Sequence, residues 1–311
     1  MQISTSLLFE RASTQMNSVQ NDLAKSQAQI AARKQVLNPS DAPDQAGAIA
    51  RLKSVIARQD SYTATLESVT TRLDNESTTL GSASDVLIRL KELAIQGNSG
   101  TQSDTSRQAI ATEMKGLRNQ LLSLANSQDT SGNYIFSGSR SRTQAFASQS
   151  DGTVLYQGDQ TRTNVAVGEQ RTVNTNRPGT SAFVRVVRGT DSEAVGVGFF
   201  QSIDELVAGV WTQGVGEPDN EAIARGIGEL GDLHKGVVLA QAESGTDLRV
   251  AEQQGAALDS TKLNLQTALS SLEDLDYASA ITKMQQQLLS MEAAQASFGK
   301  ISQLSLFNYI R

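Results

Sequence analysis

The sequence is poor in the residues that usually support catalysis or a large globular core. Its 311 residues include no cysteine, one histidine, one tryptophan and four prolines, and only 5% are aromatic. The lack of cysteine excludes disulfides and thiolate chemistry and fits either a reducing or an oxidising compartment. With so few aromatic anchors, the abundance of Ala, Leu, Gln and Ser favours extended helical packing over a large globular core.

Three further absences limit the kinds of partner. The formal net charge of -6 argues against a nucleic-acid ligand, because such a ligand needs a basic face. No stretch approaches the roughly 20 apolar residues that cross a membrane. Residues 1–10 lack the basic and apolar regions of a cleavable secretory signal, so we expect any export to follow another route. We therefore predict protein partners, and neither nucleic acid nor membrane.

The strongest pattern that is present is a heptad repeat between residues 52 and 94. Apolar residues recur there at alternating steps of three and four, and only Gln59 and Glu76 interrupt them. A 3.5-residue period sustained over this length predicts a long coiled-coil-like helix. The repeat consists of Leu52, Val55, Tyr62, Leu66, Val69, Leu73, Leu80, Ala83, Leu87 and Leu90.

Local signals mark the ends of this helix. Pro39 forces Asn38 into an extended conformation, Asp41 is predicted to cap the helix, and Pro43 suits its first turn. The segment 96–100, Gln-Gly-Asn-Ser-Gly, ends it. A short loop to a second helix makes the two antiparallel neighbours. That second helix is indicated by heptad spacing at Ile110, Met114, Leu117, Leu121 and Leu124.

The middle of the chain has a different pattern. Residues 134–188 contain short β-branched or apolar runs separated by Gly, Asp, Asn and Ser, which predicts a small antiparallel β unit. Helical periodicity resumes near Ser202, and a second long helix is predicted over about 219–275. The predicted fold class is therefore mainly α: a long antiparallel coiled-coil-like helical core with a small inserted β domain and terminal helices.

We predict five segments on these grounds. They are an N-terminal assembly segment (1–40), the N half of the helical core (41–130), the inserted β-rich domain (131–200), the C half of the core (201–275) and a C-terminal assembly segment (276–311).

Both ends of the chain carry narrow apolar stripes of the same period. A stripe this narrow buries too little surface to be stable without a partner helix. That partner is either the opposite terminus of the same chain or the termini of neighbouring subunits. Head-to-tail contacts between such subunits generate rings or helical tubes. The predicted assembly interface consists of Val19, Leu23, Ile30, Tyr277, Ile281, Met284, Leu288, Met291 and Phe298.

Motifs at both ends resemble a known family. Residues 1–5 (Met-Gln-Ile-Ser-Thr), 38–43 (Asn-Pro-Ser-Asp-Ala-Pro) and 125–138, which contain Thr-Ser-Gly-Asn-Tyr-Ile-Phe-Ser-Gly, resemble the N-terminal half of bacterial flagellins and flagellar junction proteins. Residues 272–281 and 304–307 resemble their C-terminal half. These motifs cover about half the chain in the family's order, with one departure, Ala42, where the family commonly has a second acid.

Three features resemble the junction members of the family more than the filament members. They are the Asp-Tyr-Ala-Ser-Ala-Ile stretch at 276–281, the ending Leu-Ser-Leu-Phe-Asn-Tyr-Ile-Arg at 304–311, and the small middle domain. The resemblance implies an extracellular flagellar subunit, exported unfolded through the flagellum's own channel. Its implied partners are copies of itself, another hook-associated protein on the hook side, flagellin on the filament side, and an export chaperone. The alternatives are a short flagellin that forms the filament itself and a cytoplasmic coiled-coil scaffold.

No set of residues predicts catalysis. Gly226, Gly228 and Gly231 match dinucleotide-binding spacing, but they continue a helical stripe, so we predict that they allow close helix–helix approach. His234 has neither a nucleophile elbow nor a ligand set nearby in sequence. Asp274 and Asp276 are two residues apart and do not face each other, so we predict capping or basic contacts at a helix junction. We expect no enzymatic activity, no cofactor and no metal.

Overall fold

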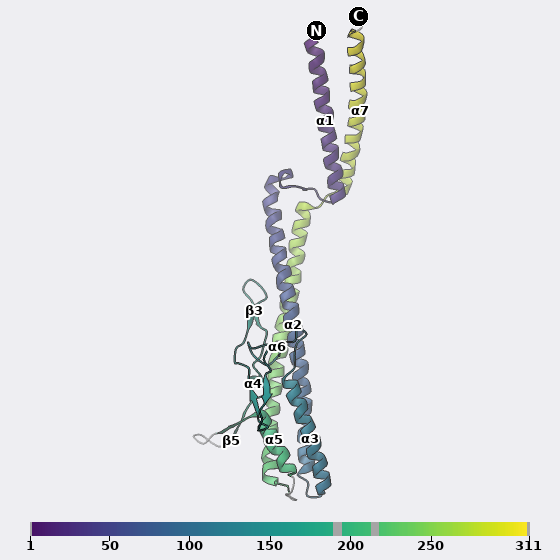
Figure 1. The fold of residues 1–311 in the computed structure, drawn as a ribbon. Coiled ribbons are helices and arrows are strands. Elements are labelled where there is room, and N and C mark those ends of the chain that lie inside the picture. The colour runs from purple at the N-terminus through teal and green to yellow at the C-terminus, as the bar shows by residue number, and fades with distance from the viewer. Residues whose placement is uncertain (1, 189–194, 213–217, 310–311) are drawn as a thin grey trace. The chain divides into compact units, whose positions relative to one another are not determined.

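The computed structural model describes residues 2–188, 195–212 and 218–309, and these form two compact units (Figure 1). One unit combines residues 1–59 with 260–311, and the other comprises residues 60–259. The first is called here the terminal unit and the second the central unit. The finer division into five segments stays a prediction.

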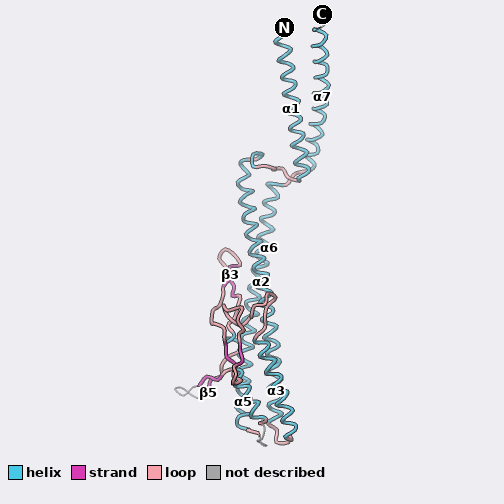
Figure 2. Tube along the Cα trace, in the orientation of Figure 1, coloured by secondary structure: helices cyan, strands magenta, loops and turns pink. Residues whose placement is uncertain are grey.

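Helices dominate both units, as Figure 2 shows. The predicted fold class is confirmed, including the two long helices and a helix at each end of the chain. The long helix predicted over about 219–275 is α6. The helices are α1 (Gln2–Ala32), η1 (Pro39–Asp41, a 3-10 turn), α2 (Pro43–Gly97), α3 (Asp104–Ala125), α4 (Gly179–Ala182), α5 (Phe199–Val210), α6 (Asn220–Glu273) and α7 (Tyr277–Tyr309).

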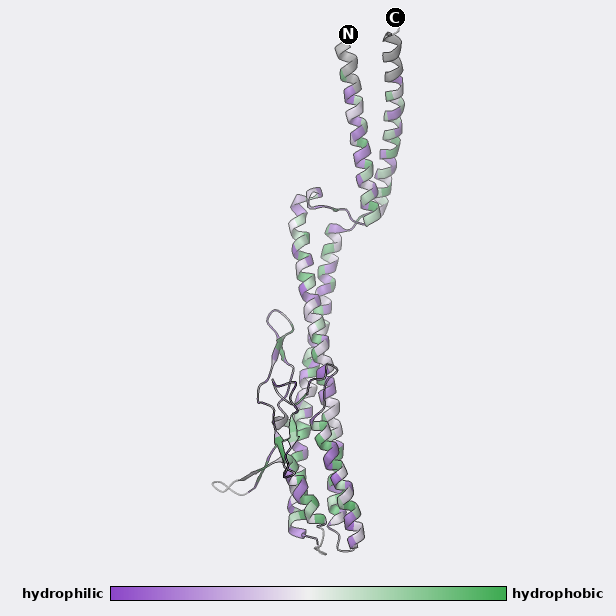
Figure 3. Cartoon of the chain, in the orientation of Figure 1, coloured by the Kyte–Doolittle hydropathy of each residue, from purple (hydrophilic) through white to green (hydrophobic). Residues whose placement is uncertain are grey.

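The heptad stripe of α2 builds the core of the central unit. Leu80 and Leu90 are fully buried, and Leu73 and Leu87 are at most 2% exposed. Leu80, Leu87 and Leu90 belong to one apolar cluster together with residues of α3, α5 and α6, such as Met114. Leu73 belongs to a second, smaller cluster. Polar and apolar residues are interspersed along the long helices in Figure 3, and no helix in the described part of the chain is apolar enough over a sufficient length to cross a membrane.

The sequence predicts one antiparallel β unit in the insert. The structure shows three separate antiparallel hairpins instead. The predicted run 134–136 is not a strand but part of a turn, and its Ile135 and Phe136 are buried in the core. Phe136 and Phe146 each pack edge-on against Phe183, with ring centroids 5.4 Å apart. The paired strands are β1 (Phe146–Ser148) with β2 (Val154–Tyr156), β3 (Asn164–Ala166) with β4 (Thr172–Asn174), and β5 (Val186–Arg188) with β6 (Val195–Val197).

The start of α2 differs from the prediction in one respect. Asn38 is extended, with φ -124° and ψ 152°, and Pro43 is the first residue of the helix, as expected. Asp41, however, does not cap α2. Its carboxylate accepts hydrogen bonds from the backbone N–H groups of Leu37 and Asn38, at 3.2 and 2.9 Å, and so caps the preceding 3-10 turn. The prediction failed because the chain makes an extra turn before the helix begins.

The two polar residues that interrupt the heptad stripe are buried in it. Gln59 is 7% exposed and Glu76 only 1%. Glu76 accepts a hydrogen bond of 2.7 Å from the Nε of Arg177, which lies in the insert. Burial raises the pKa of Glu76 above its usual value, and the interaction with Arg177 only partly offsets this. At Glu76 the heptad stripe is therefore interrupted by a buried ion pair.

The stripe's contribution to stability can be measured by truncation. Leu80→Ala should lower the free energy of unfolding by about 2–5 kcal/mol, because it leaves a cavity at a fully buried site. Leu239→Ala on α6, where the side chain is 62% exposed, should change it by about 0.5 kcal/mol or less. Urea unfolding followed by circular dichroism compares the two. Equal losses would show that the stripe of α2 does not form the core.

Candidate assembly interface

The terminal helices α1 and α7 pack against each other within the chain. Each shows buried or half-buried residues at steps of four and three, which is the spacing of a coiled-coil seam. The seam positions on α1 are Ala12, Met16, Val19, Leu23, Ser26 and Ile30, and those on α7 are Ala280, Met284, Gln287, Met291, Ala294 and Phe298. The opposite terminus is thus one of the partners that the narrow stripes require.

Six of the nine predicted interface residues lie on this internal seam. Leu23 is 6% exposed, and the other five are half-buried, namely Val19, Ile30, Met284, Met291 and Phe298. The remaining three, Tyr277, Ile281 and Leu288, are 42%, 42% and 37% exposed. The stripe predicted on α7 therefore divides into two, one packed against α1 and one facing solvent.

Helical geometry explains this division. At about 100° per residue, a strict 3.5-residue spacing drifts around an α-helix by some 20° per heptad, so one heptad stripe extends over two adjacent sides. Among the described side chains of α1 and α7, sequence reasoning missed two more exposed leucines, Leu289 at 66% and Leu7 at 47%. Neither belongs to a heptad stripe, so only the structure could identify them. The exposed residues Tyr277, Ile281, Leu288 and Leu289 are called here the open stripe of α7.

The internal seam is less apolar than the core of the central unit. It contains Ser26, which is 4% exposed, and Gln287. The side-chain oxygen of Gln287 is buried and accepts no hydrogen bond from the described residues. A buried amide without a partner costs stability, and small residues bury little area. The α1–α7 pair is thus a weaker helix pair than the leucine-rich seam of α2.

The connection between α1 and α2 forms backbone hydrogen bonds with the connection between α6 and α7. The Gln35 N–H donates to the Glu273 carbonyl at 2.8 Å, and the Leu275 N–H donates to the Arg33 carbonyl at 3.2 Å. Arg33 has φ +59°, a left-handed conformation that ends α1 sharply. The Asp276 carboxylate accepts from the backbone N–H of Ala278, at 3.0 Å, and so caps α7 as predicted.

One buried carboxylate, Glu273, gathers the charges at this junction. It is 5% exposed and contacts the ammonium groups of Lys34 and Lys53 at 2.6 and 2.8 Å. Burial acts to raise the pKa of Glu273, but the hydrogen bonds from both lysines outweigh it and hold the pKa below its usual value. Hydrogen bonds from Lys25 and from the backbone of Asn38 likewise lower the pKa of Asp41.

The other sites considered from the sequence can be placed among the described residues. The three spaced glycines lie inside α6, so the strand–turn–helix geometry of a dinucleotide site is missing. A Cβ on Gly226 would meet Leu206 at 2.8 Å, as predicted for close approach, but Gly228 and Gly231 face open space, and for them that prediction is wrong. The ring Nε2 of His234 lies 2.9 Å from the Ser84 hydroxyl. The described residues contain no group of three side chains suited to hold a metal.

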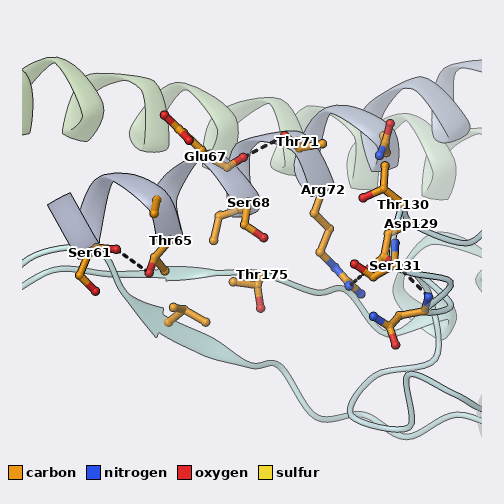
Figure 4. Close-up of a pocket in the computed structure, with 15 residues that line it drawn as sticks. Ser61, Thr65, Glu67, Ser68, Thr71, Arg72, Asp129, Thr130, Ser131 and Thr175 are labelled. Carbon is orange, nitrogen blue, oxygen red and sulfur yellow. Dashed lines mark hydrogen bonds and ion pairs between the residues drawn. The ribbon is translucent and has the colours of Figure 1, made fainter.

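A groove of about 790 Å³ runs between α2, the 129–133 loop and the β3–β4 hairpin (Figure 4). Its walls carry mainly hydroxyl and amide side chains, and several of these bond locally, as Thr65 does to the Ser61 carbonyl at 2.9 Å. The guanidinium of Arg72 reaches across to Asp129 at 2.8 Å. No histidine lines the groove, and its one basic side chain is held by this ion pair.

Comparison with known proteins agrees with the motifs. Residues 3–141 match the bacterial flagellin N-terminal helical region. The whole chain is 27% identical to flagellar hook-associated protein 3 of Salmonella typhimurium over 323 aligned positions, which cover all of both chains. It is equally 27% identical to the protein of that name from Escherichia coli, over 99% of each chain.

Solved structures share the fold. The FlgL structure from Xanthomonas campestris matches with a TM-score of 0.60 and 23% identity, over 71% of this chain and 99% of that one. The flagellar junction protein FlgL from Legionella pneumophila matches with a TM-score of 0.57 and 18% identity, over 66% of this chain and 99% of that one. These comparisons confirm the predicted resemblance to bacterial flagellins and flagellar junction proteins. The chain is similar over its full length to flagellar hook-associated protein 3.

The charged junction predicts a dependence on pH. Because the pKa values of Glu273 and Asp41 are lowered in the folded chain, their contribution to stability is present above about pH 4 and is lost as the pH falls through their folded values. Amide exchange at Gln35 and Leu275, corrected for its intrinsic pH dependence, should accelerate below pH 4. Glu273→Gln should flatten this response. Constant protection from pH 6 to pH 3 would contradict the assignment.

Proposed function

We propose that this chain is a structural subunit of the bacterial flagellum that joins the hook to the flagellin filament. The observation that carries the proposal is its similarity to flagellar hook-associated protein 3 over the full length of both chains. The chain acts outside the cell, after export through the flagellum's own channel, and it has no catalytic role. Its partners are copies of itself, another hook-associated protein on the hook side and flagellin on the filament side, with an export chaperone before delivery.

An exposed apolar surface on the terminal unit supports the proposal. Its internal seam uses one side of α7, and the open stripe of α7 remains exposed beside it. Ile281 and Leu288 are 42% and 37% exposed, so covering the rest of each side chain would stabilise a contact by roughly 0.5–1 kcal/mol. We assign the open stripe to contacts with neighbouring subunits, while the internal seam keeps each subunit's own termini together.

The two alternatives make different demands on the chain. A short flagellin has to accept copies of itself without limit, whereas a junction subunit accepts one neighbour below and another above. A cytoplasmic scaffold needs no exposed stripe and no export. Electron microscopy of a strain that lacks the protein tests the proposal. We expect complete hooks without filaments and unpolymerised flagellin in the medium, and normal filaments would contradict the proposal.

Leu288→Lys separates assembly from folding. Leu288 is 37% exposed in the free chain, so the melting temperature of the monomer should change little. In the assembled flagellum the same lysine would be buried without a partner, at a cost on the order of 3–5 kcal/mol. We therefore expect normal folding by calorimetry together with loss of incorporation into flagella.

The matched control is Leu73→Lys, at a core position that is 2% exposed. This variant should unfold the central unit and fail in both measurements. Equal loss of melting temperature in the two variants would place Leu288 in the monomer's own core and would remove the open stripe from the proposal.

Self-association distinguishes a junction subunit from a flagellin. A preference of roughly 3 kcal/mol for unlike neighbours, about a hundredfold in affinity, suffices to keep the subunit as a short layer. The purified protein should remain monomeric or form small oligomers at concentrations at which flagellins polymerise, as measured by analytical ultracentrifugation. Micrometre-long filaments of the purified chain would favour the short-flagellin alternative.

A further inference from the structure

A charged residue occupies the middle of the central leucine stripe. Glu76 lies between Leu73 and Leu80 at the expected steps of three and four, and at 1% exposure it is as buried as these leucines. One of its carboxylate oxygens accepts no hydrogen bond from the described residues. A leucine at this position would complete the stripe, so the carboxylate must provide something other than apolar burial.

The partner of Glu76 comes from the insert. Arg177 is 3% exposed, and it donates to Glu76 on α2 at 2.7 Å and to Glu243 on α6, with Asp247 on the same helix at 3.8 Å. Its neighbour Asn176 is also buried and holds the hairpin segment through side-chain bonds to the backbone of residues 161 and 163. A single buried guanidinium therefore connects α2, α6 and the insert.

The leucine stripe itself does not define how α2 and α6 align. Leu66, Leu73, Leu80 and Leu87 recur at intervals of seven residues and are all buried. If one helix shifts along the other by one heptad, about 10 Å at 1.5 Å per residue, leucines replace leucines. Glu76 is the stripe's buried charged residue and has no charged equivalent one heptad away, since Val69 and Ala83 occupy the corresponding positions.

We propose that the buried Glu76–Arg177 pair is a register lock, which selects one alignment of α2 and α6 and fixes the insert against them. In a shifted alignment Glu76 would be buried without its guanidinium, which is strongly unfavourable. Polar residues at single core positions of coiled coils fix register in the same way, at a cost in stability. This inference does not depend on the proposed function, because it concerns how the free chain folds.

The lock acts through specificity rather than stability. Removing two charges from water costs about as much as their attraction returns, so an apolar pair of similar volume is often as stable or more stable. Burial also raises the pKa of Glu76. The free-energy cost of removing the carboxylate from water is therefore larger than the gain from its contacts with Arg177. The pair should therefore be dispensable for melting temperature and required for a single alignment.

The test is the double variant Glu76→Leu/Arg177→Met in the full chain. The natural lack of cysteine allows spin labels to be placed at Glu67→Cys on α2 and Glu252→Cys on α6, both exposed positions of the central unit. We expect an unchanged or higher urea midpoint, together with a second population of label–label distances that reflects a shift of about 10 Å. The conservative variant Glu76→Gln, whose amide oxygen still accepts from Arg177, should keep one distance.

A matched control removes a different ion pair of the same unit. Arg118 and Asp204 form two hydrogen bonds, at 2.9 and 2.8 Å, between α3 and α5 and away from the stripe. Arg118→Met/Asp204→Leu should leave the distance distribution single. The proposal is overturned if the Glu76/Arg177 double variant keeps the single distance of the natural sequence, or if it fails to fold, since the pair would then supply stability and not register.

Discussion

The packing of this chain depends on how much of the apolar surface of one helix a neighbouring helix can bury. A stripe with two apolar positions per heptad is buried by one antiparallel partner. In the central unit that partner is present and the leucines of α2 are buried almost completely. In the terminal unit the same arrangement uses only part of the apolar surface of α7, and Ile281, Leu288 and Leu289 stay exposed. The free chain thus satisfies its own core and leaves an exposed apolar surface, which we propose that other subunits cover.

Charged residues have structural roles throughout this molecule. Glu273 holds Lys34 and Lys53 where the terminal helices begin and end, and Arg177 connects the insert to two helices through Glu76 and Glu243. In each case a buried ion joins segments that are distant in sequence. Such pairs add modestly to stability, but they penalise any arrangement that separates the partners. This suits a long helical protein, whose repeated stripes leave several arrangements close in energy.

The sequence predicts the helical part of the fold well because heptad spacing is a local pattern. It locates α2 and α6 to within a few residues, and it identifies the helix junction at 274–276. It does not predict how the insert folds, since three-residue strands such as β1 and β4 are too short to show a period. It also misplaces the cap of Asp41, because the extra 3-10 turn depends on contacts with the preceding residues.

The candidate interface shows the same limit. All nine predicted residues lie on α1 or α7, but sequence spacing alone does not separate the six on the internal seam from Tyr277, Ile281 and Leu288. That separation depends on which side of α7 faces α1. Arg177 could not have been predicted as the partner of Glu76, since the two are 101 positions apart in the chain and no periodic pattern connects them.

The central claim is that the open stripe of α7 becomes covered when the subunit enters the flagellum. The chain has no natural cysteine, so Ile281→Cys places a single thiol on the stripe. The direct measurement is the rate of its reaction with a maleimide in the free protein and in intact flagella. We expect rapid labelling of the free protein and labelling at least tenfold slower after assembly, which corresponds to a free-energy cost of about 1.4 kcal/mol for exposing the thiol. Equal rates in the two states would contradict it.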